Sequence, residues 1–209
     1  AFANLVQAVR NGKISWDQLN DSVERILQMK QRFGLLNPVP VTFDALGTSV
    51  KIVEHLTLSR ELAQKAITLV RDPQRLLPLK NTSLLIETGA VRDLTASIGL
   101  NGDTLKVDIQ PSAAQITEVL RAADNGSVVI VPVDDLSINK HQLNLIQALC
   151  EAGKAVIVLV HRNPFDVALL PENATILVTY GFNPPIRDAL ADVLSGKIGS
   201  SGVLPVTLP

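Results

Sequence analysis

The stretch Ala155–Pro209 decides the fold: AVIVLVHRNPFDVALLPENATILVTYGFNPPIRDALADVLSGKIGSSGVLPVTLP. It contains two short apolar runs rich in β-branched side chains, at 155–160 and 174–179. Runs of this length and composition are typical of strands that are buried on both faces of a sheet. Polar residues follow each run, so the pattern predicts two central strands with polar groups at their carboxyl ends.

Helix-start signals follow both predicted strands. Asn163 precedes Pro164, and an asparagine cap before a proline at the first helical position favours a helix start there. A second helix is predicted over 184–194, because its apolar residues lie on one helical face. The tail 202–208 is predicted to be a short final strand at a sheet edge, since Pro205 cannot donate a ladder hydrogen bond.

The same alternation of strands and helices continues towards the N-terminus. Further elements are predicted as strands at 84–87, 107–109 and 127–133 and as helices at 50–71, 112–123 and 139–151. Buried strands that alternate with helices predict a largely parallel sheet with helices on both faces. Right-handed crossovers then give a flavodoxin-like, three-layer α/β/α sandwich of five or six mostly parallel strands.

The first part of the chain has a different organisation. Two helices are predicted at 3–10 and 15–33 from the helical spacing of their apolar residues. The sequence Asn37-Pro38-Val39-Pro40 follows, and its prolines favour a stiff extended connection. The predicted domains are a helical segment (1–36), a linker (37–47) and the sandwich (48–209).

Several of these segments carry a family resemblance. The pieces RNPFD, TYG, ALADVLSG and GVLPVTLP, between residues 162 and 209, resemble the end of the second domain of family 3 glycoside hydrolases, most of all the β-N-acetylglucosaminidase branch. The segment 59–80 resembles the start of that domain. The segments 9–15 and 23–36 resemble the last helices of the family's catalytic (β/α)₈ barrel. The resemblance implies a C-terminal domain preceded by the end of a mostly absent barrel.

The resemblance also implies a function. The parent enzyme would remove terminal N-acetylglucosamine, as from peptidoglycan fragments, without a cofactor. In the family the nucleophilic aspartate belongs to the barrel, and in this branch an Asp–His pair on a barrel loop acts as acid and base. The family's β-glucosidases take an acid/base glutamate from the second domain, but no segment here matches that motif. We therefore expect no catalytic residue in this chain, which alone would be inactive and serve as a structural or lid domain.

The expected partner is the catalytic barrel of the same protein. Without it, the apolar faces of residues 3–33 must dock elsewhere, pair with a second copy of the chain or stay exposed. A dimer built on these helices is therefore an open alternative.

Composition excludes other classes of function. The net charge of −1 gives no reason to expect nucleic acid or an acidic membrane as a partner. The single cysteine, Cys150, excludes an internal disulfide and a cysteine-based zinc site, and we expect it to be buried. His55, His141 and His161 are too far apart in sequence to suggest a metal site. No apolar run reaches the ~18 residues of a membrane span, so we expect a soluble protein, either cytoplasmic or secreted and associated with the cell wall.

One group of residues is a candidate ligand site. Ligands of open parallel sheets bind at the carboxyl ends of the strands. The candidates there, besides Thr88, are Asp134, Asp135, His161, Arg162, Asn163 and Tyr180. They have two interpretations. Either they are helix caps and an ion pair of Arg162 with Asp134 or Asp135, or they form a stand-alone binding module for an amino sugar or muropeptide.

Overall fold

The computed structural model describes residues 1–40, 42–50, 52–80, 83–88, 102–123 and 127–208. The chain forms two compact units, Ala1–Ile52 and Val53–Pro209, which are described separately. The turn predicted at Asn125-Gly126 lies outside the described residues.

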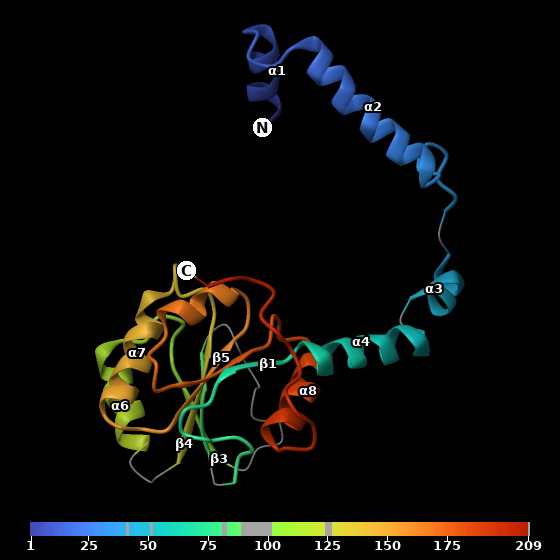
Figure 1. Cartoon of the computed structure of the whole chain (residues 1–209). Coiled ribbons are helices and arrows are strands. Elements are labelled where there is room, and N and C mark those ends of the chain that lie inside the picture. Colours follow the sequence, from blue (N-terminus) through green and yellow to red (C-terminus); the bar gives the residue numbers. More distant parts are fainter. Residues whose placement is uncertain (41, 51, 81–82, 89–101, 124–126, 209) are drawn as a thin grey trace. The chain divides into compact units, whose positions relative to one another are not determined.

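The second unit is built on a six-stranded sheet with the order β1-β6-β5-β4-β2-β3 (Figure 1). The strands are β1 (Thr68–Arg71), β2 (Ser83–Glu87), β3 (Gly102–Lys106), β4 (Val128–Val133), β5 (Val156–Val160) and β6 (Thr175–Val178). All neighbouring pairs are parallel except β1 with β6, which is antiparallel. The five parallel strands follow the doubly wound order of the flavodoxin type, which confirms the predicted fold class.

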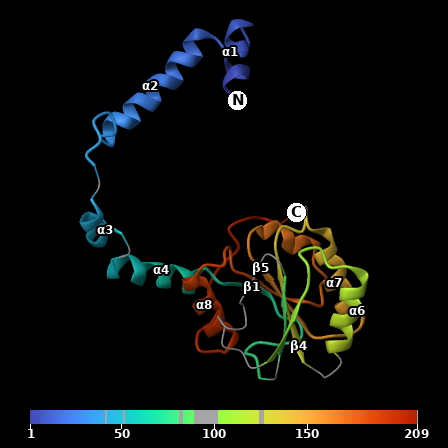
Figure 2. The same cartoon turned by 180° about the vertical axis from the view of Figure 1, so that it is seen from behind.

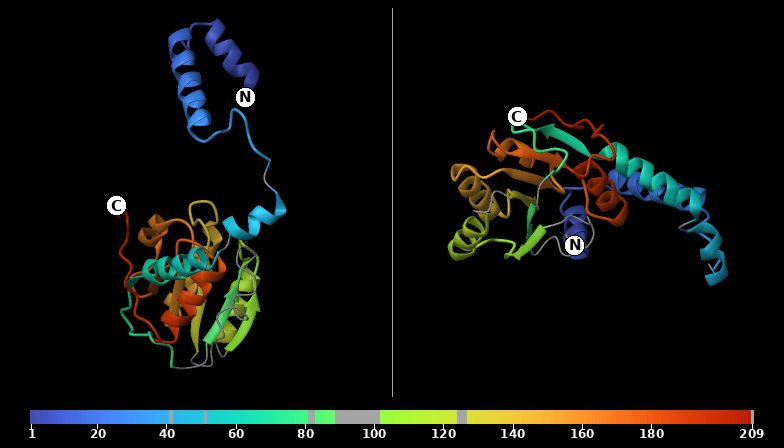
Figure 3. Two further views of the ribbon diagram at one scale, coloured as in Figure 1. Left: turned by 90° about the vertical axis from the view of Figure 1, so that its right-hand side faces the viewer. Right: turned by 90° about the horizontal axis from the view of Figure 1, so that it is seen from below.

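Helices cover both faces of this sheet. They are α4 (Val53–Ala66), α6 (Ala113–Ala122), α7 (Lys140–Glu151), the 3₁₀ helix η2 (Pro164–Leu169) and α8 (Pro184–Leu194). Residues of α6, α7 and η2 contribute to the buried cluster on one face, and residues of α4 and α8 to the cluster on the other. The view from below in Figure 3 shows α4 and α8 on the opposite side of the sheet from α6 and α7. Figure 2 shows the same layers from behind.

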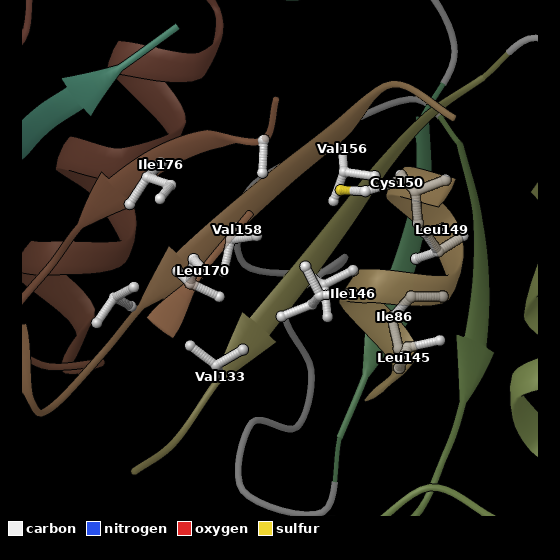
Figure 4. Packing of buried hydrophobic residues seen from close by; sticks show 14 of the residues in the cluster. Ile86, Val133, Leu145, Ile146, Leu149, Cys150, Val156, Val158, Leu170 and Ile176 are labelled. Carbon is white, nitrogen blue, oxygen red and sulfur yellow. The ribbon is translucent and has the colours of Figure 1, made fainter. Parts of the chain in front are cut away.

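The core depends on strands whose side chains are buried on both faces. Every residue of β4, β5 and β6 is buried. Figure 4 shows one of the two interfaces, where Ile146 and Leu149 of α7 lie near Val133 and Val156 of the sheet. Apolar burial of this kind is the dominant favourable term in folding.

The helix predicted over 50–71 is wrong in its last part. The helix α4 ends at Ala66, and the following residues form β1, which pairs with β6 through Thr68 and Val178. The segment Thr68-Leu69-Val70 has β-branched residues, and pairing with a buried strand overrides the local helical pattern. The carboxylate of Asp72 then fixes the turn by accepting hydrogen bonds from the backbone N–H groups of Leu76 and Leu77.

The edge strand predicted in the C-terminal tail is also wrong, because β1 forms that edge of the sheet. The tail runs beside β1 without forming a strand. The hydroxyl group of Ser200 links the tail to this part of the chain. Ser200 Oγ accepts from Leu69 N–H at 2.7 Å and donates to the Ile67 carbonyl at 2.7 Å. Gly202 N–H donates to the same carbonyl at 3.0 Å. A Cβ at Gly202 would collide with Thr68 Oγ1, so only glycine fits there.

Two further boundaries differ from the prediction. The second strand lies at Gly102–Lys106 rather than at 107–109, since Glu87 is in register with Lys106. A short helix, α3 (Phe43–Ser49), begins inside the predicted linker, and Thr42 Oγ1 caps it by accepting from Ala45 N–H. The apolar pattern is weak in both segments, so the sequence did not indicate the bounds of β3 or the presence of α3.

The first unit lacks a core among its two longer helices. Neither α1 (Phe2–Arg10) nor α2 (Trp16–Arg32) contains a buried residue. Their large apolar side chains are exposed, including Phe2, Leu5, Trp16, Ile26, Leu27 and Met29. Residues of both helices line an apolar groove of about 420 Å³. The amphipathic pattern predicted for 3–33 is therefore present without a covering element in the described residues of this unit.

Among the described residues, none of the helices has the length and apolar character that crossing a membrane requires.

Replacement of Ser200 tests the role of the tail. Ser200→Ala removes the hydrogen bond from Leu69 of β1 and the one to the carbonyl of Ile67, which precedes β1, and should lower the free energy of unfolding by about 1–2 kcal/mol. Urea denaturation of the whole chain measures this change. Ser201→Ala is the matched control, because its side chain is exposed and should change stability by less than about 0.5 kcal/mol. Equal effects of the two substitutions would contradict this role of Ser200.

Candidate functional site

The candidate site lies at the edge of the sheet where β4, β5 and β6 end in register. Val133 is paired with Val160, and Val160 with Val178. The next residue on each strand is polar, so three polar side chains start at the same level: Asp134, His161 and Thr179. Apart from Thr175 at the opposite end of β6, the residues of these three strands are apolar.

His161 is buried, with 3% of its surface exposed. Its Nδ1 lies 2.8 Å from Thr179 Oγ1, which also lies 2.9 Å from the Gly181 carbonyl. Because the Thr179 hydroxyl has one hydrogen and a carbonyl can only accept, the network assigns that hydrogen to Gly181 and a proton to Nδ1 of His161. Nε2 is then an acceptor, and none of the residues that the structure describes donates a hydrogen bond to it. The ring of Phe182 packs against the imidazole at a centroid distance of 4.8 Å.

Burial makes this histidine neutral at physiological pH. Loss of solvation lowers the pKa of His161 from 6.5 to about 4, and the nearby Gly181 carbonyl opposes the change only in part. This edge of the sheet therefore holds a neutral, buried imidazole at physiological pH.

Asp134 is positioned through its backbone. Its N–H donates to Gln142 Oε1 at 3.0 Å, and its carbonyl accepts from Asn139 Nδ2 at 2.6 Å. Gln142 is fully buried and also donates to the Ile109 carbonyl, so the start of α7 holds the end of β4. The Asp134 carboxylate lies 3.5 Å from Nε of Arg162, as the ion-pair interpretation predicted.

Two more carboxyl groups lie beside Asp134. Asp135 has a φ of +50° and accepts a hydrogen bond from the Ser137 hydroxyl. Asp166 of η2 is buried, and its Oδ2 accepts from Leu136 N–H at 3.0 Å. Desolvation raises the pKa of Asp166, the Leu136 N–H opposes this, and the charges of Asp135 and Asp134 raise it further.

Sequence reasoning missed Asp166. Its only signal was its place in the first turn of the predicted helix after Asn163, where an aspartate is usually explained by the helix dipole. Its partner, Leu136 N–H, belongs to the loop after another strand, and no sequence pattern indicated that contact.

Asn163 and Tyr180 have structural partners. Asn163 caps η2, because its Oδ1 accepts from Phe165 N–H at 3.2 Å, as the capping interpretation predicted. The Tyr180 hydroxyl lies 3.0 Å from Thr68 Oγ1 at the start of β1, and Tyr180 has a φ of +57°. Tyr180 therefore links the end of β6 to β1 and is not gathered with Asp134 and Arg162.

The end of β2 completes this edge. Glu87 is buried, and its carboxylate lies 3.7 Å from the ammonium group of Lys106. Thr88 is also buried, and its Oγ1 has no hydrogen-bond partner within the described ranges, which leave out residues 89–101. The strands β2 and β4 are the pair at which the strand order reverses, the place where open α/β sheets bind ligands.

Other candidates for chemistry are absent or inert among the residues that the structure describes. No group of three or more His, Cys, Asp or Glu side chains there could hold a metal ion. Cys150 lines a cavity of about 410 Å³ between the end of α7 and residues 169–173. Cys150 is buried as predicted, and desolvation, followed by the charge of Glu151, raises the pKa of its thiol. The thiol is therefore protonated and unreactive at neutral pH.

Comparison with known proteins gives distant relatives over the whole chain. No protein-family model matches. A periplasmic β-glucosidase of Salmonella typhimurium is 24% identical over 96% of this chain and 35% of that protein. A β-N-acetylglucosaminidase/β-glucosidase of Cellulomonas fimi is 24% identical over 98% of this chain and 41% of that protein.

A solved structure likewise matches nearly the whole of this chain. The structure of a glycoside hydrolase family 3 β-N-acetylglucosaminidase from Paenibacillus sp. str. FPU-7 superposes with a TM-score of 0.74 and 27% identity. The match covers 98% of this chain and 42% of that one. This chain therefore spans well under half the length of the relatives that it matches.

The burial of His161 predicts a pH dependence of stability. In the unfolded chain His161 becomes protonated below about pH 6.5, whereas in the folded chain it becomes protonated only near pH 4. The free energy of unfolding therefore has its full value above pH 6.5. It falls by up to about 3 kcal/mol as the pH is lowered towards 4. Urea denaturation between pH 7 and 4.5 should show a steeper loss for the natural chain than for His161→Phe.

The exposed His55 provides the control, because His55→Phe should leave the slope unchanged. Parallel pH curves for the natural chain and His161→Phe would mean that His161 is not buried in the neutral form.

Proposed function

We propose that this chain, which belongs with the family 3 glycoside hydrolases, is the C-terminal, non-catalytic part of such an enzyme and has a structural or lid role beside a catalytic barrel. Its relatives extend far beyond it, since it spans 35% and 41% of the two glycosidases described above. The active carboxyl groups would then lie in the remaining part of the protein.

The observation that carries this proposal is the state of the carboxyl groups at the sheet edge. Glycoside hydrolysis needs one carboxyl group as acid and a second one that is free to attack the sugar or activate water. Here Asp134 is paired with Arg162, and Asp135 accepts from Ser137. Asp166 is buried and bound to a backbone N–H. Each group is committed to this chain, which favours a structural role.

The first unit supports the barrel as partner. The apolar faces of α1 and α2 are exposed, and Trp16, the single tryptophan of the chain, has 68% of its surface exposed. Amphipathic helices of this kind need an apolar surface to cover them. Docking on the preceding part of the same protein would supply it. Pairing with a second copy through residues 3–33 stays an alternative prediction.

For the parent enzyme we propose removal of terminal N-acetylglucosamine. The names of the Cellulomonas and Paenibacillus relatives support this substrate, together with the resemblance of residues 162–209. The name of the Salmonella relative supports a location outside the cytoplasm.

Hydrolysis of 4-nitrophenyl N-acetyl-β-D-glucosaminide by the isolated chain tests the proposal. We expect nitrophenolate release no faster than in buffer, because each of the described carboxyl groups Asp134, Asp135 and Asp166 has a partner within the chain. Release that Asp134→Asn or Asp166→Asn abolishes would contradict the non-catalytic role. Release that both variants retain would place catalysis at other groups of this chain and would contradict it equally, once the same rate follows the protein through a second purification.

A further inference from the structure

The C-terminal tail, residues 199–208, is an extended segment that lies against one side of the second unit. Burial alternates along it, because every second residue is half-buried and the residues between are exposed; the half-buried ones are Ser200, Gly202, Leu204, Val206 and Leu208. An alternation with a period of two is typical of an extended chain that turns one side to the protein. The tail therefore resembles a strand, although it is not part of the sheet.

The inner side of the tail holds backbone groups of β1 and of the residue before it. Ser200 Oγ lies 2.7 Å from both the Leu69 nitrogen and the Ile67 oxygen, and Gly202 N–H donates to that same oxygen at 3.0 Å. Successive residues of an extended strand turn their backbone groups to opposite sides, so Ile67 and Leu69 carry the groups that a further strand would use. The tail thus occupies the place of a neighbouring strand.

The tail is anchored on both faces of the sheet. Ile198, just before it, packs against the buried cluster to which α4 and α8 contribute, whereas Leu204 and Leu208 pack against the cluster to which α6 and α7 contribute. The chain therefore crosses the edge of the sheet at Ser200 and Gly202, where it meets β1 (Figure 3). We call residues 199–208 the edge strap.

The two edge strands of the sheet differ in their exposed side chains. The strand β3 has exposed charges at Asp103 and Lys106, and charges on an edge strand oppose pairing with another chain. The strand β1 instead presents Leu69, which has 37% of its surface exposed. Its charged residue, Arg71, donates to two backbone carbonyls of the loop before β6. An apolar edge strand of this kind is a template for pairing unless another segment covers it.

We propose that the edge strap excludes a second copy of this chain from β1, and that its release opens a surface for self-association there. Two copies of β1 can pair antiparallel about a two-fold axis, which brings Leu69 of both copies into the same contact. The strap itself is a poor template for a further strand, because Pro205 has no N–H to donate. This role is separate from the proposed part in a glycosidase and does not depend on it.

Displacement of the edge strap in the whole chain tests the proposal. Gly202→Ala should release it, because the added methyl group would overlap Thr68 Oγ1 and the Ala66 carbonyl. Sedimentation velocity at several concentrations should then give a dissociation constant for self-association about tenfold or more below that of the natural chain, since the freed groups of β1 form hydrogen bonds between copies. Gly199→Ala is the matched control, because a Cβ there meets no atom within 4 Å, and it should leave the constant unchanged.

A charge on β1 connects the association to this edge. In the Gly202→Ala chain, Leu69→Lys should restore the dissociation constant of the natural chain, because two like charges would meet in the contact. Leu58→Lys places the same charge at an exposed position of α4 and should leave the tighter association in place.

A chain that ends at Gly199 lacks the edge strap altogether and should associate as tightly as Gly202→Ala. Circular dichroism shows whether each variant keeps its secondary structure. The proposal is overturned if neither Gly202→Ala nor the shortened chain associates more tightly than the natural chain, or if Leu69→Lys and Leu58→Lys have equal effects.

Discussion

The structure depends on the burial of β4, β5 and β6 on both faces. Their sequences are almost entirely β-branched or leucine, so each strand can lie only between two apolar layers. This requires α4 and α8 on one side and α6 and α7 on the other. It also leaves the strand ends as the place for polar side chains. The position of the candidate site is thus a consequence of how the core is packed.

The polar edge combines structural and unexplained groups. Asn163 and Tyr180 have partners that account for their residue types, and Gln142 and Asn139 hold the backbone of Asp134 in place. Capping and ion pairing therefore explain much of the site. They do not explain the burial of His161 Nε2, to which no residue in the described part of the chain donates a hydrogen bond.

The sequence predicted the layers of the sandwich because short, β-branched apolar runs such as 155–160 are stable only when both of their faces are buried. It also predicted the cap at Asn163, whose partner lies two residues away. It failed where distant residues decide the structure. The segment 68–71 continues the apolar pattern of α4, and only pairing with β6 makes it a strand. The roles of Asp166 and Thr179 depend on contacts to residues 30 and 18 positions away, which carry no local signal.

The apolar side chains of the second unit are buried in its own core, whereas those of α1 and α2 are exposed, and this difference supports the proposed docking of the first unit on another part of the protein. Hydrogen exchange followed by mass spectrometry on the isolated chain measures it most directly. The account predicts that amides of β4, β5 and β6 exchange only through global unfolding, whereas amides of α1 and α2 exchange orders of magnitude faster. Protection of residues 3–33 as strong as that of residues 156–160 would contradict it.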